Sequence, residues 1–421
     1  MLGKALAKQE GYRSAAYHFS KCVEFAPENI EAKLKLAEAY YETKRFQSAD
    51  ITNEAVLERE PENIHALLLK AKILIQEGKD DGTNQAEEIL KSLIAENIET
   101  AEAYTLLGGI YKKNRELFRS RDVLVEFLKK DPDHSLARSL LAEVYEELGE
   151  FSHAEKEYLS LFSKYPGSDE LKDAIIRFYL EAQQIDSAQK FLENLVLEFP
   201  DSYKNRMRLV KFYEELDEKT LMVQALEETI KDFPQEFEPV KLKAEYLNET
   251  RQVESALTVL KEFAGRVTTG PMHLAALNLS AQILLQAGRA TEALSMAEKV
   301  LEKNPGDFQA NALKGDVLLS QKNYTGALVA YRIVLVEQPG NIPIYVKIGD
   351  AHRLGRQYLL AAEFYKNALG KDPSHLKARL GLAKTFIQLG KRNNALKQIK
   401  ILIDQYPENE EANALLKEVS N

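Results

Sequence analysis

Prolines recur along this chain at an almost constant interval, and this interval constrains the fold more than any other feature. They stand at positions 27, 61, 132, 166, 200, 234, 271, 305, 339, 373 and 407, and Ile98 occupies the one place that the series leaves open. The spacing is 34 residues, except for 37 residues between 61 and 98 and between 234 and 271. A fixed period of roughly 20 to 50 residues is the signature of a repeat array. We therefore predict one array of about twelve repeats.

Each repeat reads as two helices separated by a turn, as the segment 135–166 illustrates. Its apolar residues recur at helical spacing in two groups, Leu141, Ala142, Tyr145 and Ala154, Tyr158, Leu161. Gly149 between the groups suits a helix C-terminus, and Pro166 cannot continue a helix. The sequence therefore predicts a helix, a turn, a second helix and a stop in every 34 residues.

Small side chains recur at two places in the repeat. Ten of the twelve residues that stand twelve positions before the boundaries are alanine (for Ala256 the count runs to position 268). A second series of Gly or Ala lies early in the first helices and includes Gly108, Gly315 and Gly349. A larger side chain at a close contact between helices would overpack it, at a cost of about 1–3 kcal/mol. Both series predict that the helices of a repeat approach closely.

These columns resemble the tetratricopeptide repeat. The fourth and eleventh repeats show the motif in two sets, Tyr104, Leu107, Gly108, Tyr111, Pro132 and Tyr345, Ile348, Gly349, Ala361, Tyr365, Pro373. The resemblance covers essentially residues 1–421. It implies an all-α solenoid in which about twelve helix-turn-helix repeats stack into a right-handed superhelix with a concave groove.

The array is expected to fall into four segments. Residues 1–263 hold repeats 1 to 8, residues 264–270 are a possible hinge, residues 271–407 hold repeats 9 to 12, and residues 408–421 form a capping helix. The first repeat is incomplete, and Cys22 is expected in the core of its second helix. An insertion near 80–82 is expected to lengthen a turn. We also expect the natural chain to continue upstream of Met1, with an export signal, an anchor or further repeats.

Composition and motifs argue against several functions. The net charge of −9 disfavours nucleic acid as a general partner. No run of 18 apolar residues is present, so no membrane span is predicted. The seven histidines lack metal-ligand spacing, and His352 is expected to be a core residue. Gly265 and Gly270 are not followed by the Lys-Ser/Thr of a phosphate loop. We therefore expect no enzyme, cofactor or metal.

The face of each first helix opposite its apolar positions is implied by the resemblance to line the groove. Charged residues dominate it in the middle of the chain: Glu143, Glu146, Glu147, Arg177, Glu181, Lys211, Glu214, Glu215, Glu245 and Glu249. Towards the C-terminus it becomes less polar: Leu319, Val346, Arg353, Leu380, Lys384 and Ile387. One interpretation is a channel for an extended or helical partner segment with a basic centre. The other is a solvated surface that keeps the array soluble.

The favoured function is a non-enzymatic scaffold that captures a protein or peptide partner and organises an assembly. The divergent repeats are similar to bacterial envelope proteins of exopolysaccharide or protein export. The sequence does not decide the compartment, which could be the bacterial periplasm or envelope, or the cytoplasm. Two alternatives remain open. The array could be the targeting or regulatory part of an enzyme or regulator whose active domain lies upstream, or it could self-associate end to end through its first helix.

Overall fold

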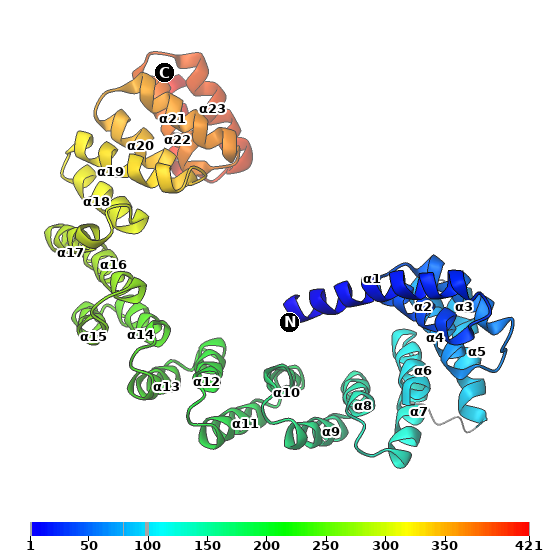
Figure 1. Cartoon of the computed structure of the whole chain (residues 1–421). Helices are drawn as coiled ribbons and strands as arrows, with labels where there is room; N and C mark the ends of the chain where they lie inside the picture. Colours follow the sequence, from blue (N-terminus) through cyan, green and yellow to red (C-terminus); the bar gives the residue numbers. More distant parts are fainter. Residues whose placement is uncertain (1, 79, 97–100, 421) are drawn as a thin grey trace. The chain divides into compact units, whose positions relative to one another are not determined.

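The chain is helical throughout the residues that the structure describes. The computed structural model describes residues 2–78, 80–96 and 101–420, and in these ranges it contains 24 helices and no strand (Figure 1). The predicted all-α solenoid class is therefore confirmed. Ile98, expected at a repeat boundary, lies outside the described residues. The chain divides into two compact units, Met1–Leu192 and Glu193–Asn421, called here the first unit and the second unit.

The helix bounds follow the predicted period. The first unit contains α1 (Leu2–Phe25), α2 (Ile30–Glu42), α3 (Phe46–Leu57), α4 (Ile64–Glu77), α5 (Asp80–Ala95), α6 (Ala101–Lys113), α7 (Leu117–Lys130), α8 (Ser135–Glu147), α9 (Phe151–Lys164) and α10 (Asp169–Glu181). The division falls within α11 (Ile185–Glu198). The second unit continues with α12 (Tyr203–Glu215), α13 (Lys219–Asp232), α14 (Phe237–Glu249), α15 (Val253–Arg266), α16 (Pro271–Gln286), α17 (Ala290–Lys303), α18 (Phe308–Ser320), α19 (Tyr324–Glu337), α20 (Ile342–Leu354), α21 (Tyr358–Lys371), α22 (Leu376–Gln388), α23 (Arg392–Gln405) and α24 (Glu410–Ser420).

Successive even-numbered helices contact one another along much of each unit, and we call these helices the inner row. In the first unit α2 contacts α4, α4 contacts α6 and α6 contacts α8. In the second unit the same holds for α14 with α16, α16 with α18, α20 with α22 and α22 with α24. In these stretches an even-numbered helix touches the next even-numbered helix, as nearest-neighbour stacking requires.

The residue two positions after a boundary proline fixes where the next inner helix begins. Its side chain accepts a hydrogen bond from the backbone N–H three residues further on, as seen for Asn29, Asn63, His134, Ser168, Ser202, Asp307, Asn341, His375 and Asn409. Such a cap satisfies one of the free donors at a helix N-terminus and stabilises it by about 1 kcal/mol. The proline interval and the cap together set the phase of the array.

The first repeat differs from the expected hairpin. α1 runs without a break from Leu2 to Phe25, and Gly11 lies inside it. One glycine costs an α-helix only about 1 kcal/mol, which does not end it when no second breaker stands nearby. Cys22 is exposed, so the expectation that it packs in the core was wrong.

Both three-residue insertions lengthen helices. Residues 80–82 belong to the first turn of α5, so the expected longer turn was wrong. In the second unit α16 has 16 residues, whereas α18 has 13. The connection between α15 and α16 spans only 267–270, as long as the connection 165–168 between α9 and α10. The hinge suggested for 264–270 stays a prediction.

Candidate functional site

A hollow of about 590 Å³ lies along the inner row of the second unit, and we call it the central hollow. Side chains of α14, α16, α18 and α20 line it, so four successive repeats contribute to one surface. Its apolar lining comprises Phe237, Ala275, Leu279, Leu285, Ala312 and Leu313. Its polar lining comprises Lys241, Glu245, Asn278, Gln282, Gln286, Gln309, Asp316 and Lys347. The hollow therefore offers apolar surface, amides and both signs of charge together.

Asp316 is held in place at one end of the central hollow. The buried Tyr331 hydroxyl donates to its Oδ1 at 2.7 Å, and Lys347 Nζ lies 2.7 Å from its Oδ2. Burial raises the pKa of Tyr331, and the neighbouring Asp316 carboxylate raises it further. The tyrosine is therefore a permanent hydrogen-bond donor, and Asp316 presents a fixed, partly neutralised carboxylate.

The amides of the central hollow were not among the predicted site residues. Asn278 Nδ2 donates to Asp307 Oδ1 at 3.1 Å and lies 3.3 Å from Gln309 Oε1, which links α16 to α18. Asn248 Nδ2 donates to Gln286 Oε1 at 2.8 Å and links α14 to α16. Gln282 is exposed between these pairs. The pattern of charged and apolar residues in the sequence does not single these amides out, although their recurrence at groove positions of successive repeats was a usable signal.

The acidic residues predicted for α14 lie at the rim of this surface. Glu245 lines the central hollow, and Glu249 lines an adjoining hollow of about 430 Å³ between α14 and α16. Burial raises the pKa of Glu245; Lys241 lowers it, while Glu238, Glu249 and Glu214 raise it. This carboxylate therefore lacks full compensation for its charge.

The predicted residues of α12 are exposed. Lys211, Glu214 and Glu215 all face solvent. Within the described ranges, no ion pair of 4 Å or less involves these three residues, Glu245 or Glu249. The second unit therefore presents four carboxylates, Glu214, Glu215, Glu245 and Glu249, that no cation among the described residues neutralises by direct contact.

The predicted acidic residues of the first unit are mostly engaged. Lys112 of α6 pairs with Glu143 and lies 3.5 Å from Glu147, and Arg115 lies 2.6 Å from Glu147. Glu146 accepts a hydrogen bond of 2.8 Å from Tyr158. Burial raises the pKa of Glu146, the Tyr158 hydrogen bond lowers it, and Glu181 raises it.

Arg177 and Glu181 are both exposed and lie 3.8 Å apart. The predicted acidic residues of the first unit are thus largely neutralised, chiefly by cations from the repeat that precedes them.

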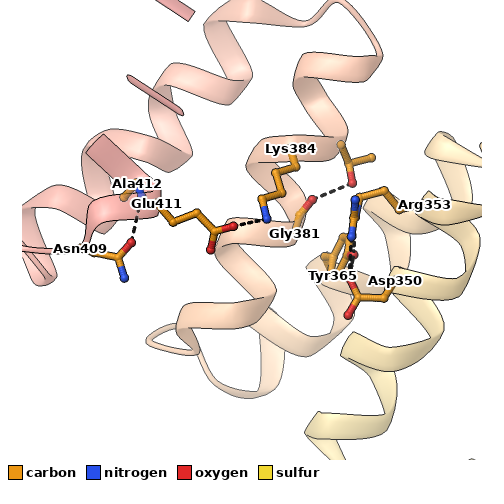
Figure 2. Close-up of polar contacts among 9 residues, drawn as sticks. Asp350, Arg353, Tyr365, Gly381, Lys384, Asn409, Glu411 and Ala412 are labelled. Atoms are coloured by element: carbon orange, nitrogen blue, oxygen red, sulfur yellow. Dashed lines mark hydrogen bonds and ion pairs between the residues drawn. The ribbon is translucent and has the colours of Figure 1, made fainter. Parts of the chain in front are cut away.

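The predicted residues near the C-terminus fall into polar pairs and core positions (Figure 2). The Tyr365 hydroxyl donates to Asp350 at 2.6 Å, and Arg353 lies 3.2 Å from the same carboxylate. Lys384 pairs with Glu411 of α24, as Figure 2 shows.

The apolar candidates divide between core and surface. Val346 and Leu380 are buried in the apolar core that surrounds Tyr365, so they do not line an open groove. Leu319 is half-buried against the cluster around Tyr331. Ile387 is half-buried and lines, with Arg353 and Lys384, a separate hollow of about 400 Å³. The less polar end of the predicted groove is therefore partly interior.

The described ranges contain neither a metal-binding cluster nor a membrane-spanning helix. Among those residues, no three His, Cys, Asp or Glu side chains are grouped in a way that could hold a metal ion. None of the described helices combines the length and apolar character that crossing a bilayer requires. His352 is buried, with Nδ1 2.6 Å from Gln357 Oε1 and its ring stacked on Phe364.

Solved structures with a similar arrangement include three named proteins. MamA 41-end from Desulfovibrio magneticus RS-1 is 23% identical, has a TM-score of 0.37, and the match covers 41% of this chain and 95% of that one. Yeast Tom70 is 13% identical with a TM-score of 0.43, over 99% and 93%. YrrB, described as a TPR protein with an unusual peptide-binding site, is 18% identical with a TM-score of 0.39, over 46% and 99%. No curated protein matches the chain.

Family models identify the repeats directly. Two models, both described as tetratricopeptide repeat, match residues 105–169, 241–298 and 279–342, and residues 6–73 and 355–419. Together they cover well over half of the chain, in both compact units. The chain belongs to the tetratricopeptide repeat family.

Proposed function

We propose that this protein is a non-catalytic scaffold that holds a segment of a protein partner in the central hollow. The observation that carries the proposal is the composition of that surface. Four successive inner helices line one hollow of about 590 Å³ with apolar, amide and charged side chains. Ligand sites typically combine apolar walls with a few placed polar groups. A surface shared by several repeats suits a long ligand better than a small molecule.

The amides are suited to an unfolded peptide backbone. An Asn or Gln side chain has an NH₂ donor and a carbonyl acceptor, the same pair that each peptide group presents. Gln282 is exposed, and Asn278 and Gln309 are held in register by their mutual contact. The leucines Leu279 and Leu285 beside them would receive apolar side chains of the same segment.

The unpaired carboxylates at the rim favour a basic residue near the centre of that segment. Glu245 has a raised pKa because it is partly buried without full compensation. A Lys or Arg placed between Glu245 and Glu249 would stabilise the ionised carboxylates. Such complementarity raises the association rate and selects the partner's orientation.

We further propose that capture of this partner organises an assembly. The divergent style of the repeats favours an assembly of the bacterial envelope, such as an exopolysaccharide or protein export system. Identification of the partner would decide this setting.

Site-specific photo-crosslinking tests the groove proposal. A photoreactive phenylalanine analogue would replace exposed Gln282 on α16 or, as a matched control, exposed Lys299 on α17. After irradiation in the cells that make the protein, the Gln282 variant should give a discrete protein adduct that the Lys299 variant lacks. Mass spectrometry would identify the linked segment. Identical adducts from both positions, or none from Gln282, would refute the proposal.

A further inference from the structure

The distribution of charge along the chain singles out its C-terminal repeats. Residues 305–407 contain 15 Lys and Arg against 7 Asp and Glu, an excess of eight positive charges in a chain whose net charge is −9. Charge asymmetry of this kind selects partners of the opposite sign. A site on these repeats should therefore differ in preference from the acidic rim of the central hollow.

The turn between α20 and α21 exposes an apolar surface, which we call the α20–α21 edge. It consists of Leu354, Arg356, Tyr358, Leu359, Leu360 and Leu389. Leu354, Leu359 and Leu360 are 45%, 68% and 44% exposed. Single exposed leucines are ordinary on protein surfaces, but three within seven positions form a patch.

Two hollows meet at this edge. One of about 350 Å³ is lined by Arg356, Gln357, Tyr358, Leu359, Leu360 and Leu389. The other, of about 400 Å³, shares Arg356 and Tyr358. It adds three apolar residues, Leu354, Ile387 and Leu415, and four polar ones, Arg353, Lys384, Gln388 and Glu418. The edge therefore has two adjacent recesses that share Arg356, the first with mainly apolar walls and the second with mixed apolar and charged walls.

The cations around the edge differ in whether they already have an ion-pair partner. Arg353 is bound to Asp350 and Tyr365, and Lys384 is bound to Glu411 (Figure 2). Arg356 is exposed in the left-handed turn position, with φ of 60°. In the described part of the chain its guanidinium has no ion-pair partner within 4 Å. Lys391 and Arg392, which follow Leu389 at the turn between α22 and α23, also lack an ion-pair partner among the described residues.

We propose that the α20–α21 edge docks an acidic amphipathic segment of a protein partner. Apolar side chains of the segment enter the two recesses, and its carboxylates pair with Arg356 and with the cations of the next turn. Glu418 also lines the second recess, so the carboxylates of the segment would lie on the side of Arg356 and the next turn, away from Glu418. The edge is separate from the central hollow, so this inference does not depend on the proposed function.

The experiment uses the full chain and a defined probe. The probe is a fluorescein-labelled amphipathic peptide with leucines at helical positions i, i+3, i+4 and i+7 and glutamates elsewhere. Its twin carries lysine in place of every glutamate. By fluorescence anisotropy the acidic probe should bind at least about tenfold more tightly than the twin, a difference of about 1.4 kcal/mol.

Variants then locate the binding. Arg356→Glu and Leu359→Glu should each weaken the acidic probe about tenfold or more. The matched control is Lys322→Glu. Lys322 occupies the same left-handed turn position one repeat earlier, with φ of 63°, but none of the exposed leucines lies in its turn. This control should change affinity less than about threefold, and circular dichroism melting should show that all three variants fold.

Several outcomes would overturn the inference. These are no binding of the acidic probe, equal binding of both peptides, or an equal loss in Lys322→Glu, which would indicate general charge attraction. Displacement of the probe by phosphatidylserine vesicles, with a stronger effect than any peptide, would indicate a lipid surface instead. Replacement of Gln282 should leave probe binding unchanged, so failure of the proposed function and failure of this inference are distinguishable.

Discussion

The first and second units are built from the same repeat, yet the acidic residues predicted for their grooves differ in how they are paired. We call these residues the acidic columns: Glu143, Glu146, Glu147 and Glu181 in the first unit, and Glu214, Glu215, Glu245 and Glu249 in the second. In the first unit Lys112 and Arg115 neutralise Glu143 and Glu147 across successive inner helices. In the second unit Glu245 and Glu249 stand beside hollows with no such partner in the described chain. A series of like charges in the sequence therefore does not by itself indicate a binding surface. The structure must first show whether side chains of the preceding repeat pair with those charges.

The small residues show a similar contrast. In the second unit, a Cβ at Gly349 would lie 2.7 Å from Tyr365 Cε1, which is closer than Cβ atoms approach other atoms in real proteins. In the first unit, a Cβ at Gly109 would meet nothing within 4 Å. Tyr365 is fully buried and its hydroxyl is fixed by Asp350, so it cannot move aside. One glycine is required by packing, and the other is not.

The largest expected effect comes from that pair of glycines. Gly349→Ala should lower the free energy of unfolding by about 1–3 kcal/mol, because overpacking exceeds the gain in helix propensity. Gly109→Ala, in the interior of α6, should instead raise it by up to about 1 kcal/mol. Urea unfolding followed by circular dichroism would measure both. Equal effects at the two positions would contradict the contrast.

The acidic columns give the second prediction. Glu245→Lys combined with Glu249→Lys should weaken binding of a labelled peptide with two central lysines and flanking leucines by about tenfold, or 1.4 kcal/mol. The matched reversal, Glu143→Lys with Glu147→Lys, should leave that affinity within about twofold, because these carboxylates are already paired. Isothermal titration calorimetry would test this. A larger loss in the first unit would show that its groove is the binding surface.

The third prediction concerns stability. Lys112→Gln should lower the free energy of unfolding by about 0.5–1 kcal/mol, since it removes the cation that contacts both Glu143 and Glu147 at a partly exposed site. Lys211→Gln should have no measurable effect, because this lysine of the second unit is exposed and has no ion pair with any described residue. Thermal melts at low and high salt would compare them, and the Lys112 effect should shrink with salt.

The smallest expected effect is the pH dependence of peptide binding in the second unit. The pKa of Glu245 is raised above its ordinary value of 4.5, so this carboxylate gains a proton at a higher pH than a solvated glutamate does. Binding of the lysine-centred peptide should therefore weaken about two- to threefold between pH 7 and pH 5, beyond any change at exposed carboxylates. Glu245→Gln should abolish this additional decrease. A dependence that persists in the variant would assign it to other groups.

The predictable parts of the fold are those encoded locally. The proline interval, the capping residue two positions later and the apolar spacing place the inner helices and identify the repeat. The exceptions have physical reasons. A single Gly11 does not end α1, and inserted residues extend α5 and α16 because one more helical turn satisfies more backbone hydrogen bonds than a longer loop.

The sequence alone determined the class of structure and the phase of each repeat, since both depend on residues within one period. The tertiary structure decided which candidate residues are available. It buried Val346 and Leu380, paired Glu143 with Lys112, and brought Asn278 and Gln309 together from different repeats. These outcomes depend on contacts between residues about 30 positions apart, and a pattern within one repeat carries no information about the side chain that the next repeat places opposite it.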